Sequence, residues 1–278
     1  RSSAASDVYK RQMVNRGVEI TLSGEIIRQK DFSWNASLLY AFNRNKVKHI
    51  SVQPSLWDSR ISMPTSYPMV GKPLYGIYAY KWAGLNENGD PQVYDAENNV
   101  TSGPARDYHA LVYCGTTVPI HNASLTNVLR YKGFEFSAML ILDAGHKLRS
   151  SNIPSINMSN GRITSTAKGI VDRWTQPGDV TDVPRLLFSN DTENFNTHRT
   201  ELYRYSDLFV YDASNIRLSN ISLAYRVPAH WCKKISLSGA RLQFNVENVA
   251  TFAFDSKANY DLGGKVKPNY VWGLYLNF

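Results

Sequence analysis

The chain of 278 residues carries 31 Lys or Arg and 23 Asp or Glu, which gives a formal net charge of +8. Its hydrophobic content of 43% excludes an intrinsically disordered chain, because enough apolar side chains are present to pack. No run of about 18 apolar residues occurs, which excludes a transmembrane helix, and two cysteines are too few for a disulfide scaffold. The basic residues are spread along the chain, so we expect no nucleic-acid partner.

The first residues of the chain differ from the rest. Residues 1–12 read RSSAASDVYKRQ and contain no apolar run, so they are not a signal peptide. They resemble a translated sequencing-adapter stretch, and the alternative is an ordinary polar terminus. We therefore expect an artefactual, non-native leader over residues 1–12 and assign residues 13–278 to the folded protein.

Alternation of apolar and polar residues begins directly after this leader. The even positions of residues 17–26 are apolar or Gly, and the odd positions are polar or Gly. Residues 32–43 repeat the apolar pattern at every even position. Each stretch predicts a β-strand with one dry and one wet face, and the short link at residues 29–31 predicts a hairpin.

The same pattern returns along the chain. Residues 121–131 and 134–142 alternate around a turn at Lys132-Gly133. Residues 215–227 alternate with one change of parity, which predicts a β-bulge. Residues 241–251 and 270–278 complete a set of seven predicted strands.

The lengths of strands and links favour a membrane barrel. The predicted strands have about ten residues, the length that crosses a bilayer when tilted. Short links at 29–31 and 132–133 alternate with long ones at 46–120, 147–212 and 252–268, and the link at 228–238 is intermediate. In an up-and-down sheet the long links then share one side, as in outer-membrane barrels. We predict an all-β, antiparallel up-and-down transmembrane β-barrel, of which this chain is a part. The alternative is a soluble or secreted β-sandwich that binds carbohydrate, because its strands also alternate.

The last predicted strand alternates without a break and stops at an aromatic residue. It resembles the signal that outer-membrane barrels present to the barrel-assembly machinery. The residues that form this expected signal are Tyr270, Trp272, Leu274, Leu276 and Phe278.

Several stretches resemble the SusC/RagA family of TonB-dependent outer-membrane receptors. The matching stretches are NRGVEI at 15–20, GKPLYGIYAYKWAGL at 71–85, NGDP at 88–91, DRWTQPGDVT at 172–181, SNIRLSNISLAY at 214–225 and ENVAT at 247–251. They follow the family order over residues 13–278. The segment Tyr260-Asp261-Leu262 departs from the D-P-E that members often carry.

The resemblance implies that the chain is the carboxy-terminal part of a larger barrel and lacks the plug domain and the TonB-contacting segment. A seven-stranded sheet alone in lipid would leave two edges of unpaired backbone groups, which agrees with a part of a larger barrel. The resemblance also implies active import of oligosaccharides or peptides across the outer membrane of a Gram-negative, Bacteroidetes-like cell. The implied partners are outer-membrane lipids, TonB and a SusD-like surface lipoprotein that caps the extracellular mouth.

The long links would help to form that mouth, and they contain several aromatic residues. Aromatic faces stack on sugar rings, so these side chains are candidate contacts with a ligand or with the lid. The alternative is that they are buried within the loops. The candidates are Tyr75, Tyr78, Tyr80, Trp82 and Trp174.

Other chemistry is only weakly indicated. Asp172, Asp179 and Asp182 could imitate a paired-carboxylate site, although solvated loop carboxylates are the favoured interpretation. The stretch N-x-N-x-D at residues 86–90 lacks the Glu of a calcium loop and is better explained as a turn. No histidine pair has metal-binding spacing. We expect no catalytic residue, metal or cofactor, and no disulfide between Cys114 and Cys232, which are predicted at opposite ends of the barrel.

Overall fold

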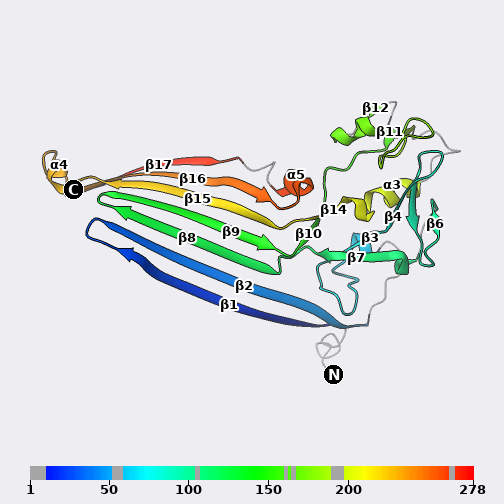
Figure 1. The fold of residues 1–278 in the computed structure, drawn as a ribbon, viewed down its shortest axis with the longest axis horizontal. Helices are drawn as coiled ribbons and strands as arrows, with labels where there is room; N and C mark the ends of the chain where they lie inside the picture. The colour runs from blue at the N-terminus through cyan, green and yellow to red at the C-terminus, as the bar shows by residue number, and fades with distance from the viewer. Residues whose placement is uncertain are drawn as a thin grey trace, which may run out of the picture. The chain divides into compact units, whose positions relative to one another are not determined.

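The computed structural model describes residues 11–51, 59–103, 107–159, 162–163, 167–188, 197–262 and 267–278 (Figure 1). The chain divides into two compact units. The loop unit comprises Arg1–Asn15, Asn45–Val118 and Lys147–Tyr211. The sheet unit comprises Arg16–Arg44, Pro119–His146 and Asp212–Phe278. Residues 1–10 of the expected leader lie outside the described residues, and the interpretation of residues 1–12 stays a prediction.

The large sheet contains seven strands that lie side by side in sequence order (Figure 1). They are β1 (Arg11–Arg28), β2 (Phe32–Ile50), β8 (His121–Tyr131), β9 (Phe134–Ala144), β15 (Asn215–Arg226), β16 (Gly239–Ala253) and β17 (Asn269–Asn277). All seven predicted strands are confirmed, although β1, β2 and β16 extend beyond the predicted ends. Their extensions mix polar and apolar residues, because a strand continues wherever its backbone is paired, whether or not its side chains alternate.

Two local features predicted for these strands are confirmed. The register of β15 shifts between Leu218 and Asn220 against both of its neighbours, as expected for a β-bulge. Lys132 and Gly133 form the tight turn between β8 and β9, and Lys132 has a positive φ of 51°. A Cβ on Gly133 would lie 2.8 Å from the carbonyl oxygen of Arg226, so only glycine lets this turn approach β15 so closely.

The apolar face of the large sheet is exposed. Val18, Leu22 and Leu274 expose 56%, 60% and 62% of their surface, and Trp272 exposes 78%. In the β-sandwich alternative these side chains would be buried against a second sheet, so that alternative is wrong for this fold. The result confirms an all-β, antiparallel up-and-down sheet of the barrel type, which is open here with β1 and β17 at its edges. Asn127 shares the apolar face, where Trp34 Nε1 donates to its Oδ1 at 3.1 Å.

The links alternate in length as predicted. Three residues join β1 to β2 and two residues join β8 to β9, whereas the long links leave β2, β9 and β16. The intermediate link carries α4 (Ala229–Lys233), and the last link carries η4 (Ser256–Ala258) and α5 (Asn259–Leu262). Among the described residues, no helix has the length and apolar character needed to cross a membrane.

The loop unit has its own small sheets and helices, which the alternation pattern did not predict. Its strands are β3 (Gly76–Tyr80), β4 (Trp82–Leu85), β5 (Pro91–Tyr94), β6 (Val100–Thr101), β7 (Leu111–Thr116), β10 (Lys147–Arg149), β11 (Asn157–Ser159), β12 (Arg162–Ile163), β13 (Leu187–Phe188) and β14 (Val210–Asp212), the last of which ends one residue beyond the unit. Its helices are α2 (Ser59–Ser62), η1 (Tyr108–Ala110), η2 (Lys168–Asp172), α3 (Thr197–Arg204) and η3 (Asp207–Phe209).

A small hydrophobic core holds the loop unit together. Tyr78, Tyr80 and Val93 are almost fully buried and pack with Leu111 and Leu202. These residues come from three of the small strands and from α3, so the core joins both long segments of the unit. Each fully buried apolar side chain contributes about 1.5–3 kcal/mol, so the two long links are packed structure rather than independent loops.

Both cysteines are free thiols. Cys114 lies in β7 of the loop unit, and Cys232 lies in α4 of the sheet unit. Burial, with a smaller contribution from the charge of Asp207, raises the pKa of Cys114 to about 11. This thiol is therefore protonated at neutral pH and is a poor nucleophile.

Candidate functional site

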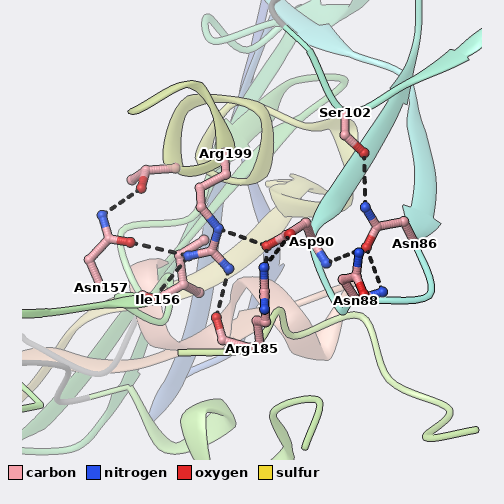
Figure 2. A network of polar contacts seen from close by, with 9 residues as sticks. Asn86, Asn88, Asp90, Ser102, Ile156, Asn157, Arg185 and Arg199 are labelled. Atoms are coloured by element: carbon pink, nitrogen blue, oxygen red, sulfur yellow. Dashed lines mark hydrogen bonds and ion pairs between the residues drawn. The ribbon is translucent and has the colours of Figure 1, made fainter. Parts of the chain in front are cut away.

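A network of ion pairs in the loop unit contains one buried arginine, Arg199, and two partly buried partners, Asp90 and Arg185 (Figure 2). Asp90 ends the turn that precedes β5 and receives hydrogen bonds from two arginines. Arg185 donates Nε to Oδ1 at 3.1 Å and Nη2 to Oδ2 at 2.8 Å, which is the bidentate geometry of strong Arg–carboxylate pairs. Arg199 of α3 donates Nε to Oδ1 of the same carboxylate at 3.1 Å. One carboxylate thus joins segments about a hundred residues apart.

Arg199 is the most deeply buried charge of this network. Only 3% of its side-chain surface is exposed. Its Nη1 donates to the Ile156 carbonyl and to Asn157 Oδ1, both at 3.2 Å, and its Nη2 donates to the Arg185 carbonyl at 2.7 Å. Burial lowers the pKa of Arg199, and the nearby Asp90 carboxylate opposes that shift. The guanidinium stays charged because it is paired and hydrogen-bonded on all sides.

The turn from Asn86 to Asp90 is closed by its own side chains. Asn86 Oδ1 accepts hydrogen bonds from the backbone N–H groups of Asn88 and Asp90, each at 2.9 Å, and Asn86 Nδ2 donates to Ser102 Oγ at 3.4 Å (Figure 2). Asn86 Oδ1 and the Asp90 carboxylate are therefore already occupied by N–H donors. This arrangement agrees with the turn interpretation of residues 86–90 and leaves these two groups unsuited to calcium.

Trp174 packs directly on this turn. Gly89 has a φ of 74°, and a Cβ placed on it would lie 2.4 Å from Cδ2 of the Trp174 ring. The backbone N–H of Trp174 donates to the Val183 carbonyl at 2.8 Å. Gly89 is thus required both by its backbone conformation and by the indole that covers it. The contact fixes the position of Trp174 relative to residues 86–90.

The segment after Trp174 is held by Asp179. Its Oδ2 accepts from the backbone N–H and the hydroxyl of Thr175, each at 2.8 Å, and from the backbone N–H of Gln176 at 3.1 Å. These hydrogen bonds, those of Thr175 first, lower the pKa of Asp179 below its ordinary value. Asp182 in turn accepts from Trp82 Nε1 at 2.9 Å. The sequence favoured solvated loop carboxylates over a glycosidase pair; Asp179 and Asp182 do lie in loops, where they accept hydrogen bonds from neighbouring residues.

The turn at residues 86–88 and the segment from Trp174 to Thr181 border a cleft of about 630 Å³, which we call the Trp174 cleft. It combines one indole, amide and carboxyl side chains and an exposed apolar rim, a composition suited to ligands with both apolar faces and hydrogen-bonding groups. No group of three or more His, Cys, Asp or Glu side chains in the described part of the chain could hold a metal ion. The cleft is lined by Leu85, Asn86, Glu87, Asn88, Trp174, Pro177, Gly178, Asp179, Val180 and Thr181.

The five aromatic residues proposed from the sequence have different surroundings. Tyr78 and Tyr80 are core residues with 1% and 0% exposure, so their expected contact with a ligand or lid is wrong. Strand β3, which carries both, is buried on its two faces, and the sequence pattern alone could not indicate this. Tyr75 is 45% exposed, and Trp82 and Trp174 are partly exposed.

The sequence pattern does not indicate the arginines of the network. The N-x-N-x-D turn is recognisable in the sequence, but no motif points to Arg185 or Arg199, which lie 95 and 109 residues from Asp90. The only related signal was the position of Asp90 directly before Pro91 at the end of a turn. Pairing over such separations is visible only after the chain has folded.

Comparisons with known proteins agree with the fold. No family model matches the chain. The curated TonB-dependent receptor P3 of Formosa agariphila is 24% identical over 284 residues, and the match covers 95% of this chain and 27% of the relative. TonB-dependent receptor P26 of the same organism is 25% identical and covers 82% of the chain and 23% of the relative. The chain therefore spans about a quarter of the length of these relatives.

Solved structures give the same result. The RagAB peptide transporter matches with a TM-score of 0.70 at 21% identity, over 96% of this chain and 30% of the solved chain. The RagAB peptide importer in its closed-closed state matches with a TM-score of 0.68 at 21% identity, over 96% and 30%. The resemblance indicated by the motifs is thereby confirmed, since the chain is similar to TonB-dependent receptors in sequence and shares the fold of RagAB over less than a third of their length.

Proposed function

We propose that the chain is part of a TonB-dependent active importer of oligosaccharides or peptides in the outer membrane of a Gram-negative, Bacteroidetes-like cell. One observation carries the proposal: a seven-stranded antiparallel meander leaves its apolar face exposed and sends every long link to the same side. A sheet of this kind is stable where lipid covers the apolar face and the remaining strands of a barrel pair with its edges. The curated relatives are receptors, so we propose no enzymatic activity.

The membrane location is supported by the outer face of β17. Tyr270, Trp272, Leu274, Leu276 and Phe278 share this face and are exposed by 42% to 92%. We propose that they contact outer-membrane lipids and present the signal for the barrel-assembly machinery. Phe278→Ala should reduce the heat-modifiable receptor recovered from outer membranes, whereas Asn277→Ala on the opposite face should not. Equal recovery of both variants would remove the signal from the proposal.

The loop unit supports the proposed external partners. Its two long segments share one core and would form a rigid part of the barrel mouth. A SusD-like lipoprotein would cap this mouth, and TonB would supply the energy for transport. Both partners follow from the resemblance to the receptors. Co-purification of a surface lipoprotein with the affinity-tagged receptor from detergent-solubilised outer membranes would test the first partner.

Substrate contact is proposed for the three aromatic residues that the fold leaves accessible, Tyr75, Trp82 and Trp174. Trp174 has the strongest support because it lines the cleft with the amides of Asn86 and Asn88. The solved neighbours are named for peptide transport, whereas an indole beside amide and carboxyl groups also suits a sugar chain.

A transport experiment tests the function and the substrate class together. A strain without the gene should lose growth on one class of oligomer, either oligosaccharide or peptide, and the wild-type gene should restore it. Trp174→Phe should weaken uptake, and Val171→Ala serves as the control because this exposed residue does not line the cleft. Unchanged growth on every oligomer after gene deletion would refute the importer proposal.

A further inference from the structure

Two arginines face each other on the polar side of the large sheet. Arg226 of β15 is the register partner of Arg241 of β16. The neighbouring pair, Tyr225 and Leu242, belongs to the apolar face, so by alternation Arg226 and Arg241 both lie on the polar face. Like charges directly opposite each other destabilise a pair of strands. The Arg226–Arg241 pair therefore needs a compensating interaction, because the two strands are otherwise well paired along their length.

The carboxylate of Glu135 pairs with two other arginines, Arg130 and Arg241, and not with Arg226. Glu135 of β9 accepts from Arg130 Nε at 2.7 Å through Oε2 and from Arg241 Nη2 at 3.1 Å through Oε1. Arg241 reaches Glu135 across Ala224, which is only 3% exposed. Both carboxylate oxygens are therefore engaged by other arginines, and within the described chain Arg226 makes no ion pair. Arg130, Arg226 and Arg241 carry three positive charges and Glu135 carries one negative charge, so these four side chains have an excess of two positive charges.

The same residues border a small cavity, which we call the arginine pocket. Its volume is about 160 Å³, several times the roughly 30 Å³ that one water occupies in the liquid. The Arg226 backbone N–H donates to the Gly133 carbonyl at 2.8 Å, which holds the turn between β8 and β9 beside the end of β15. The pocket is lined by Arg130, Lys132, Gly133, Phe134, Glu135, Ala224, Arg226 and Arg241.

We propose that the arginine pocket binds an oxyanion, with Arg226 as the main contact. Guanidinium groups recognise carboxylate, phosphate and sulfate by paired N–H donors, and an anion between Arg226 and Arg241 removes their repulsion. The oxyanion is either free, as inorganic phosphate is, or the carboxylate of another segment of the protein that lies on the polar face of the sheet. The pocket belongs to the sheet unit alone and is independent of the Trp174 cleft.

Thermal unfolding of the intact protein in detergent tests the pocket, with inorganic phosphate as the probe at constant ionic strength. With a free oxyanion, phosphate raises the unfolding midpoint in a saturable way, and Arg226→Gln weakens the apparent phosphate affinity about tenfold or more. With a carboxylate from the protein, phosphate has no effect but Arg226→Gln lowers the midpoint. In both cases Arg226→Lys keeps the positive charge but loses the paired N–H donors of the guanidinium, so its effect on the measured quantity lies between those of the wild type and Arg226→Gln.

The matched control is Arg28→Gln, which removes one positive charge from a side chain that is 82% exposed at the end of β1. It should leave both the midpoint and the response to phosphate unchanged. An unfolding midpoint that does not fall in Arg226→Gln, together with no effect of phosphate, overturns the proposal. If the pocket holds no anion, Arg226→Gln relieves the repulsion with Arg241, so the midpoint stays or rises and phosphate shifts neither protein.

Discussion

At the residue scale, Arg199 is the side chain on which the loop unit most depends. It is buried, and its removal would leave the Ile156 carbonyl with only the Leu187 N–H, would take the side-chain donor from the Arg185 carbonyl and would leave Asp90 with one arginine instead of two. We expect Arg199→Met to destabilise the loop unit by about 3–5 kcal/mol. Limited proteolysis of the intact protein should then cut within residues 147–211 much faster than in the wild type.

The comparison variant for this prediction is Arg28→Met, because that side chain is largely in solvent and its pair with Glu25 spans 3.5 Å. Exposed pairs of this kind contribute about 0–1 kcal/mol, so cleavage should not change. Equal cleavage of the Arg199 and Arg28 variants would mean that the Asp90 network does not hold the loop unit together.

Asp179 gives a pH-dependent prediction at the same scale. Hydrogen bonds from Thr175 and Gln176 lower its pKa below the ordinary 3.8, so the folded loop prefers the ionised carboxylate. The stabilisation is present above that ordinary value and is lost as the pH falls through the lower pKa of the folded state. Hydrogen exchange at the amides of Thr175 and Gln176, corrected for intrinsic rates, should lose protection as the pH falls below 3.8 and through the lower pKa of the folded state.

Asp179→Asn isolates the charge in this experiment. The asparagine oxygen still accepts a hydrogen bond but does not titrate in this range, so protection should be lower and independent of pH. A wild-type protection that stays constant over the whole acid range would contradict the role of the carboxylate.

At the element scale, the turn at Gly89 is the point where residues 86–90 meet Trp174. Gly89→Ala should cost more than an ordinary substitution at positive φ, because the added Cβ also meets the indole at 2.4 Å. Gly178→Ala is the matched control: its φ is 98°, and a Cβ there meets nothing within 4 Å. The control should cost about 1 kcal/mol, as an alanine in a left-handed conformation does.

The readout for this pair is the indole itself. Gly89→Ala should displace Trp174 and shift the tryptophan fluorescence of the intact protein toward that of Trp174→Phe, while Gly178→Ala should leave the spectrum unchanged. Identical spectra for both alanine variants would show that Trp174 does not rest on Gly89.

The same scale separates what the sequence could predict from what it could not. The strands of the large sheet have alternating side chains, because one face meets an apolar and one a polar environment, so residues 121–131 were predicted with their observed ends. Strand β3 is buried on both faces and has no alternation, so the sequence left open whether Tyr78 and Tyr80 contact a ligand or are buried within the loops. Three of the ten residues that line the Trp174 cleft, residues 86–88, belong to a turn that the sequence predicted, but the arginines that hold Asp90 at the end of this turn make contacts distant in sequence.

At the scale of the whole molecule, the exposed apolar face separates a membrane protein from a soluble one. Leu242 is 50% exposed on β16, and its neighbour Gln243 lies on the polar face. In water, lysine at either position would be harmless. In a bilayer, Leu242→Lys should cost up to about 2–4 kcal/mol near the midplane, whereas Gln243→Lys should cost far less. Unfolding by denaturant in lipid vesicles measures the free energy of unfolding of both variants. Equal stability of Leu242→Lys and Gln243→Lys would contradict contact of Leu242 with lipid.

The order of the seven strands was predictable at this scale because each link joins neighbours, so the topology follows from counting hairpins. A closed barrel could not be predicted from the strand pattern, because the edge strands β1 and β17 have outer partners only if further strands exist. The resemblance to receptors supplied that expectation, and the lengths of the curated relatives agree with it.

The separation of Asp90 from its two arginines has a consequence for the order of events during biogenesis. The β8–β9 hairpin lies between the two halves of the loop unit in the sequence. On the export route of the importer that we propose, segment 45–118 would therefore wait, with the Asp90 carboxylate unpaired, until the hairpin and α3 have emerged from the export channel. This long-range closure is slow compared with forming a hairpin, so on that route periplasmic chaperones would meet the chain with its loop unit still unfolded.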